Sequence, residues 1–172
     1  MRLIELRQYT LHSGRRDELI DLFEAHFVTG QQAFGMEILG TFHDLDRPDM
    51  FVWMRAFPSE QERLDALRGF YTSPIWKEHG PAANDTMIDS DDVLLLHEVR
   101  GELPDGDDLV IGVWDAPAEP DGWVFETALV PNDFPLPVRD DRCVVALSRG
   151  LPSLSGAKQV LRLQPTATSA LR

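Results

Sequence analysis

The sequence is poor in cysteine, in basic residues and in long apolar segments, and each shortage excludes a class of protein. A single cysteine, Cys143, cannot form an internal disulfide. No apolar run reaches the roughly 18 residues of a membrane-spanning helix, and no signal peptide is recognisable after Met1. The 16 Lys and Arg residues face 29 Asp and Glu residues, and the net charge of −13 disfavours nucleic acid and anionic membranes as partners. We therefore expect a cytoplasmic protein with no nucleic-acid and no membrane partner.

Motifs for phosphate and metal binding are missing too. No glycine-rich loop has the spacing that cradles a phosphate. His79 and His97 stand alone, without Cys or carboxylate neighbours at the spacing of metal ligands. The acidic residues around Gly106 are typical of a solvated turn rather than a calcium site. We expect no metal, and the residues themselves indicate no cofactor.

What the sequence does contain is an internal repeat. The strand-like pattern of residues 3–9 returns at residues 109–114, and that of residues 51–56 returns at residues 143–148. A repeat predicts two similar units that bury one face against each other. With 172 residues, of which 43% are hydrophobic, the chain is one large domain or two small units that share a core. We divide it into a unit of residues 1–100, an acidic linker of residues 101–108 and a unit of residues 109–172.

The first unit predicts an α+β fold. Alternation of apolar and polar residues indicates strands, placed at residues 2–10, 36–43, 50–57 and 93–99. Helical spacing after Ser13-Gly14 predicts one helix between the first two strands. A capping box of Ser59 and Glu62 predicts another before the fourth. The order βαββαβ is that of a ferredoxin-like unit.

An ordered set of segments in this unit resembles the NIPSNAP family. These segments are residues 3–11 with Ser13-Gly14, residues 35–42, Trp53 with Arg55, residues 70–76 and residues 89–96. The resemblance implies a dimeric α/β-barrel, in which two ferredoxin-like sheets face each other. It also implies a superfamily of cofactor-free monooxygenases, cyclases, isomerases and some haem enzymes. Haem is thereby left open, although no haem ligand can be chosen from the sequence.

The second unit departs from this pattern because it has almost no room for helices. Four strands are predicted, at residues 109–116, 123–130, 142–149 and 159–164, as a second antiparallel four-stranded sheet. Ferredoxin order needs a crossover of about 25 Å, or about eight extended residues, and the segment 115–122 just supplies it. A plain meander of hairpins is easier to close, but the strand sequences resemble the family, so we predict that ferredoxin order is retained.

Losing the helices should also uncover an apolar face of this second sheet. Val110 and Trp114 are apolar on one face, and Ile111 and Val113 on the other. An uncovered apolar sheet usually has a partner. We therefore predict a homodimer or a larger homo-oligomer.

Candidate site residues follow from the strand alternation, which leaves alternate side chains of the first and third strands for the space between the two sheets. A pocket there suits a flat, partly anionic small molecule, because aromatic walls give apolar contact and an arginine fixes orientation. The candidate catalytic residues are His43, as a base, and Arg55, which would hold an enolate or carboxylate. The candidate ligand-binding residues are Glu5, Arg7, Tyr9, Trp53 and His97.

A structural interpretation of the same residues is favoured over catalysis. Glu5 with Arg7 or Arg55 is typical of a buried ion network, and Trp53 and Tyr9 are typical core aromatics. Two functions stay open. The first is a small-molecule enzyme, such as a cofactor-free monooxygenase, cyclase or isomerase, which a bound metabolite would favour. The second is a non-catalytic binding or scaffold protein, which a filled barrel would favour.

Overall fold

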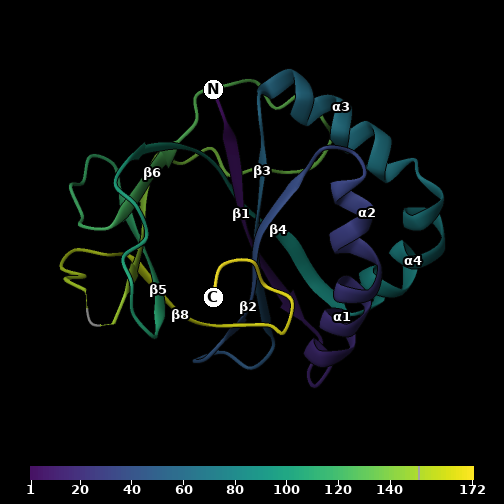
Figure 1. The fold of residues 1–172 in the computed structure, drawn as a ribbon, viewed down its shortest axis with the longest axis horizontal. Helices are drawn as coiled ribbons and strands as arrows, with labels where there is room; N and C mark the ends of the chain where they lie inside the picture. The colour runs from purple at the N-terminus through teal and green to yellow at the C-terminus, as the bar shows by residue number, and fades with distance from the viewer. Residues whose placement is uncertain (151) are drawn as a thin grey trace.

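Eight antiparallel strands close into one barrel (Figure 1). A computed structural model describes residues 1–150 and 152–172. Around the barrel the strands follow the order β1-β3-β2-β8-β5-β7-β6-β4. Their bounds are β1 Leu3–Leu11, β2 Glu37–Asp44, β3 Met50–Phe57, β4 Met87–Arg100, β5 Leu109–Asp115, β6 Trp123–Thr127, β7 Cys143–Arg149 and β8 Gln159–Pro165.

Within residues 1–150 and 152–172, helices cover only the first half of the barrel. α1 (Arg16–Leu22), a π-helix η1 (Phe23–Phe27) and α2 (Val28–Gln32) follow β1, while α3 (Glu60–Tyr71) and α4 (Pro74–Asp85) follow β3. In Figure 1 all of them lie on one side, away from β5 and β6. The predicted capping box is confirmed, since Ser59 Oγ accepts from the Glu62 N–H at 3.2 Å and donates to its carboxylate at 2.9 Å.

Both units have ferredoxin strand order. The first reads β4-β1-β3-β2 and the second reads β8-β5-β7-β6, so the same order survives without the helices. The prediction that the second unit retains this order is confirmed. The predicted pair of facing sheets needs a correction, because β4 pairs with β6 and β2 pairs with β8. These two junctions leave neither sheet with a free edge.

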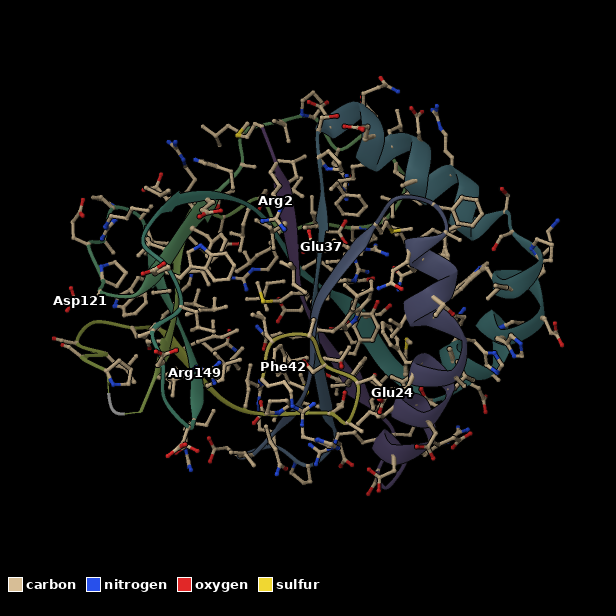
Figure 2. All side chains as sticks on the ribbon, in the orientation of Figure 1. Arg2, Glu24, Glu37, Phe42, Asp121 and Arg149 are labelled. Atoms are coloured by element: carbon tan, nitrogen blue, oxygen red, sulfur yellow. The ribbon has the colours of Figure 1, made fainter. Side chains whose placement is uncertain are left out.

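Aliphatic side chains from both units fill the barrel, and Figure 2 shows the interior occupied, with Phe42 inside it. Ile4 and Leu6 pack there against Ile111 and Val113. The predicted facing of the strands is therefore wrong, because the alternate residues of β1, Glu5, Arg7 and Tyr9, were expected in the space between the two sheets. Both faces of β1 and β3 are buried, so alternation shows which residues share a face but not which face points inward. An eight-stranded barrel is narrow enough for side chains to fill.

The outer face of the second sheet is covered by its connections instead of by helices. Its buried side chains are Trp114, Val124, Val144 and Ala146, and Ala118, Leu154 and Ala157 of the two short connections pack on them. The prediction of an uncovered apolar face is wrong. Short connections without helices cover this face, because the large Trp114 side chain beneath them fills much of the space. The homo-oligomer, which that face motivated, stays a prediction; sedimentation at micromolar concentration tests it against a 19.4 kDa monomer.

Candidate functional site

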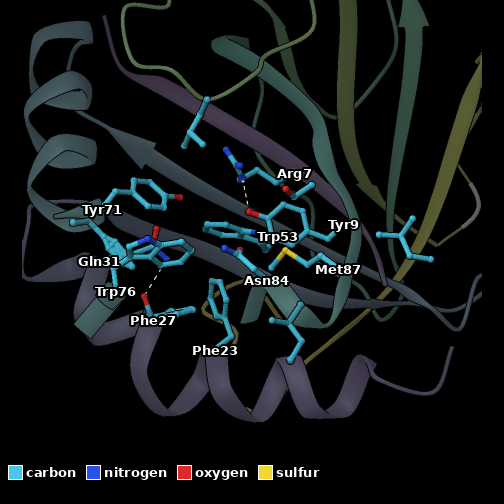
Figure 3. Close-up of a pocket in the computed structure, with 15 residues that line it drawn as sticks. Arg7, Tyr9, Phe23, Phe27, Gln31, Trp53, Tyr71, Trp76, Asn84 and Met87 are labelled. Atoms are coloured by element: carbon cyan, nitrogen blue, oxygen red, sulfur yellow. Dashed lines mark hydrogen bonds between the residues drawn. The ribbon is translucent and has the colours of Figure 1, made fainter. Parts of the chain in front are cut away.

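A cavity of about 380 Å³ lies between the first sheet and its helices (Figure 3). Strands supply Arg7, Tyr9 and Trp53 to its wall, and helices supply the opposite side. Apart from the polar atoms of its aromatic residues, the polar groups are few, namely Arg7, Gln31, Asn84 and Ser90. Aromatic rings make up much of the rest: Tyr9, Phe23, Phe27, Trp53, Phe70, Tyr71 and Trp76. The predicted pocket between the two sheets is thus wrong in place, since that space is filled.

The π-helix η1 shapes the helical wall of this cavity. Phe23 and Phe27 project from η1, and the Phe23 ring centroid lies 4.8 Å from that of Trp53. Gln31 follows one turn later; its amide donates to the Phe27 carbonyl at 3.0 Å and its Oε1 accepts from Arg55 at 2.7 Å. Single π-turns inside helices frequently mark functional sites. The sequence predicted an ordinary helix here, because a π-turn leaves no signal in apolar spacing.

Three arginines converge on one buried carboxylate behind the cavity wall. Glu5 Oε2 accepts from Arg55 Nε at 2.6 Å and from Arg7 Nη1 at 2.7 Å, and Glu5 Oε1 accepts from Arg63 Nε at 2.9 Å. All four residues are at most 3% exposed. The predicted ion network is confirmed, although it packs against helices rather than inside the barrel. Arg63 was missed, yet it shares the buried stripe of α3 with Ala66, Leu67 and Phe70, and that position was the available signal.

The electrostatics of this cluster are unbalanced. Burial alone would raise the pKa of Glu5, but the charges of Arg55, Arg7 and Arg63 outweigh it and hold that pKa well below its usual range. Every ion pair of these arginines within residues 1–150 and 152–172 ends on Glu5. Aromatic faces give partial compensation, since the Arg55 guanidinium lies 5.0 Å from the Trp53 ring centroid. Three positive charges therefore share one negative charge.

Tyr9 connects the cluster to the cavity. Arg7 Nε donates to the Tyr9 hydroxyl oxygen at 3.0 Å, as the dashed line in Figure 3 marks. Burial raises the pKa of Tyr9, and the neighbouring charge of Arg7 opposes that rise. Because the oxygen is occupied by Arg7 as acceptor, the hydroxyl proton is free to donate. In the described part of the chain no residue accepts it.

Similarity to known proteins places this architecture in a family. The NIPSNAP family model matches residues 4–99, more than half of the chain. The chain belongs to the NIPSNAP family. A NIPSNAP family protein from Agrobacterium tumefaciens strain C58 has 17% identity and a TM-score of 0.53, over 58% of this chain and 94% of that one. A second Agrobacterium tumefaciens protein has 21% identity and a TM-score of 0.53, over 57% and 94%.

These two relatives cover little more than half of the present NIPSNAP chain. A candidate monooxygenase from Lactobacillus acidophilus NCFM matches both units, with 11% identity, a TM-score of 0.60 and coverage of 99% of this chain and 97% of that one. At such low identity the likeness shows the fold alone. No curated protein matches the chain. Within the described residues, no helix is long and apolar enough to cross a bilayer, and no group of three or more His, Cys, Asp or Glu could hold a metal ion.

Some of the predicted site residues line the cavity of this NIPSNAP protein, and others do not. Arg7, Tyr9 and Trp53 line it, and Glu5 and Arg55 lie directly behind them. His43 and His97 do not line it. The roles predicted for all seven residues stay predictions, but their gathering at one pocket between the sheets is wrong.

The predicted pairing of His43 with Arg55 fails on distance. His43 pairs with Phe51 on β3, four residues along the strand from Arg55, which is about 13 Å. The His43 ring lies at α1, with Nε2 4.0 Å from the Asp17 carboxylate. Burial and the charge of Arg16 lower the pKa of His43. Alternation could not reveal this separation, because it gives a face and not a position along the strand.

Proposed function

We propose that this protein binds a small, largely aromatic molecule in the cavity between the first sheet and its helices. The observation that carries the proposal is the wall itself, in which aromatic rings surround a few converging polar groups. Its volume of about 380 Å³ falls within the range typical of small-molecule sites. Aromatic rings stack or pack edge-on with flat ligands, so a planar molecule gains most from this wall.

The chemistry that we propose for this cavity is a cofactor-free reaction of the monooxygenase, cyclase or isomerase kind. Arg7 supplies a fixed positive charge and Tyr9 a free hydroxyl proton, and such donors stabilise an oxyanion that develops during a reaction. The candidate monooxygenase of the same two-unit fold supports this only as an analogy of fold. Among the described residues the cavity wall offers no His or Cys as a haem ligand, and the hydroxyl oxygen of Tyr9 already accepts from Arg7, so the proposal uses no haem.

The non-catalytic alternative has one observation in its favour. The barrel is filled by an apolar core, as expected for a scaffold protein. The cavity, however, lies outside the barrel, so the filled barrel does not remove the ligand site. Native mass spectrometry of freshly purified protein separates the two functions, since a co-purified organic molecule supports the first.

Blocking the cavity should abolish ligand binding. Ser90 lines the cavity on β4 and is half-buried, so Ser90→Trp places an indole in the space that a ligand needs. We expect binding of naphthamide, a neutral aromatic probe, to weaken about tenfold or more in isothermal titration calorimetry, because a steric block removes most of the apolar contact. The matched control is Asp89→Trp at the neighbouring exposed position, which does not line the cavity. Equal binding by both variants would place the ligand elsewhere.

A further inference from the structure

We propose that the ligand is an aromatic monoanion, a carboxylate, phenolate or enolate, whose negative charge lies against Arg7. This inference rests on the proposed function, because it assigns a charge to the molecule in the same cavity. It goes further than the aromatic wall, which by itself is compatible with a neutral molecule. The argument comes from the charge of the buried cluster and from the donors that it presents to the cavity.

Charge is the first step. Arg7, Arg55 and Arg63 are buried, and Glu5 is the one carboxylate with which they form ion pairs in the described residues. Buried charges are unfavourable unless they are paired. The surplus does not come from the overall composition, because the chain carries a net charge of −13. A ligand with one negative charge would reduce the surplus of this cluster.

Access is the second step. Of the three arginines, Arg7 alone lines the cavity. Its Nη1 and Nε are taken by Glu5 and Tyr9, whereas its Nη2 makes no hydrogen bond to a described residue. Glu5 does not accept from Arg7 Nη2; its Oε2 accepts from Arg7 Nη1 and Arg55, and its Oε1 accepts from Arg63. An anion in the cavity can approach the free side of the guanidinium.

The neighbouring donors are the third step. Trp53 Nε1 is buried and has no acceptor among the described residues, and Trp53 lines the same cavity. The Tyr9 hydroxyl proton is equally free. Figure 3 shows Arg7, Tyr9 and Trp53 grouped on the strand side of the cavity. No Asp or Glu is among the described residues that line it, so nothing in the wall repels an anion.

The residues of the cavity wall also indicate which class of anion the cavity binds. One guanidinium and a few uncharged donors suit a single negative charge, whereas a phosphate dianion is usually held by several cations or by a row of backbone N–H groups. The aromatic rings require that the remainder of the molecule be flat and apolar. An aromatic carboxylate, or a phenol or enol bound in its ionised form, meets both conditions.

A matched pair of probes tests the charge separately from the ring. Naphthoate and naphthamide share the ring system and differ in charge. We expect wild-type protein to bind naphthoate about tenfold more tightly than naphthamide in calorimetry at neutral pH and low salt, a preference typical of one favourable charge contact. Arg7→Met should remove this preference and leave naphthamide binding within about threefold. The control is Arg68→Met on the exposed side of α3, which removes an equal charge and should keep the preference.

The outcomes separate the two proposals. Equal affinity for the two probes in wild-type protein would overturn the anion and leave the aromatic site standing. Binding of neither probe would overturn the proposed function itself. A preference that persists in folded Arg7→Met would overturn the assignment of the charge to Arg7.

A measurement on wild-type protein keeps the inference testable if Arg7→Met does not fold. The nitrophenolate form of para-nitrophenol absorbs visible light, so its ionisation can be followed while it is bound. A site that favours the anion should lower the apparent pKa of the bound probe by about one unit. An unchanged or raised pKa of the bound probe would overturn the inference.

Discussion

Glu5→Gln is expected to lower the free energy of unfolding by about 3–5 kcal/mol, the range seen when one partner of a buried ion pair is removed. The reason is that Glu5 is the one carboxylate with which Arg7, Arg55 and Arg63 form ion pairs in the described residues. Glutamine keeps the shape and one carbonyl acceptor but removes the charge, and its amide N–H₂ faces guanidinium donors. Urea unfolding followed by circular dichroism gives the measurement.

The matched control is Arg55→Met. This change leaves Glu5 with two arginines and reduces the surplus positive charge, while methionine replaces much of the apolar volume. We expect a smaller loss of about 1–3 kcal/mol, because two arginines still pair with Glu5 and the main cost is that buried Gln31 Oε1 loses its donor. If Glu5→Gln proves no more harmful than Arg55→Met, the cluster is not organised around a single anion.

The difference in unfolding free energy between wild type and Glu5→Gln has a defined pH dependence. The folded pKa of Glu5 lies well below its ordinary value of 4.5, so the unfolded chain takes up the proton first as the pH falls. The stability that the Glu5 charge contributes is thus fully present above about pH 4.5, and it is lost as the pH falls from there through the folded pKa. The difference in unfolding free energy between wild type and Glu5→Gln should therefore be constant near neutrality and shrink on acidification. A difference that grows in acid would contradict the assignment.

Strand alternation could predict the membership of each face but not its direction. Glu5, Arg7 and Tyr9 do share a face with each other, as do Trp53 and Arg55 on β3, and Arg55 does contact Glu5. The direction failed because β3 is buried along its whole length, so apolar residues occur on both of its faces. The π-turn that places Gln31 could not be predicted, and the helical spacing of Arg63 could indicate that it is buried but not that its partner is Glu5.

Ferredoxin order in the second unit was predicted because its strands resemble the family and its crossover segment was just long enough, but the cover of its sheet was not predictable. The segment between β5 and β6 was long enough to cross and too short for a helix, and the observed order confirms that reasoning. That unit contributes no helix in the described residues, so the sheet–helix arrangement that forms the aromatic cavity is found on the first unit. The second unit supplies the sheet that closes the barrel. Its outer face depends on one large side chain.

Trp114→Ala is expected to lower the free energy of unfolding by about 3–5 kcal/mol, as for other buried Trp or Phe truncations. The Trp114 ring folds back over Gly112, since a Cβ built there would lie 2.3 Å from Trp114 Cη2, and Leu154 packs beside the ring. Its Nε1 donates to the Ser155 carbonyl at 2.9 Å, so the ring also fixes the strap between β7 and β8. Alanine would leave a bare stretch of β5 and release that strap.

Val160→Ala is the control for this variant, because Val160 lies on neighbouring β8 and is 39% exposed. It should change the unfolding free energy by no more than about 0.5 kcal/mol, as usual for a surface substitution. Naphthamide binding by folded Trp114→Ala should stay within about threefold of wild type, because Trp114 packs on the outer face of the second sheet and does not line the cavity. A loss of stability below about 1 kcal/mol would show that the strap, rather than the indole, covers the sheet. A loss of ligand binding in protein that remains folded would show that the outer face of the second sheet also shapes the cavity, to whose wall Leu136 is the contribution of the second unit among the described residues.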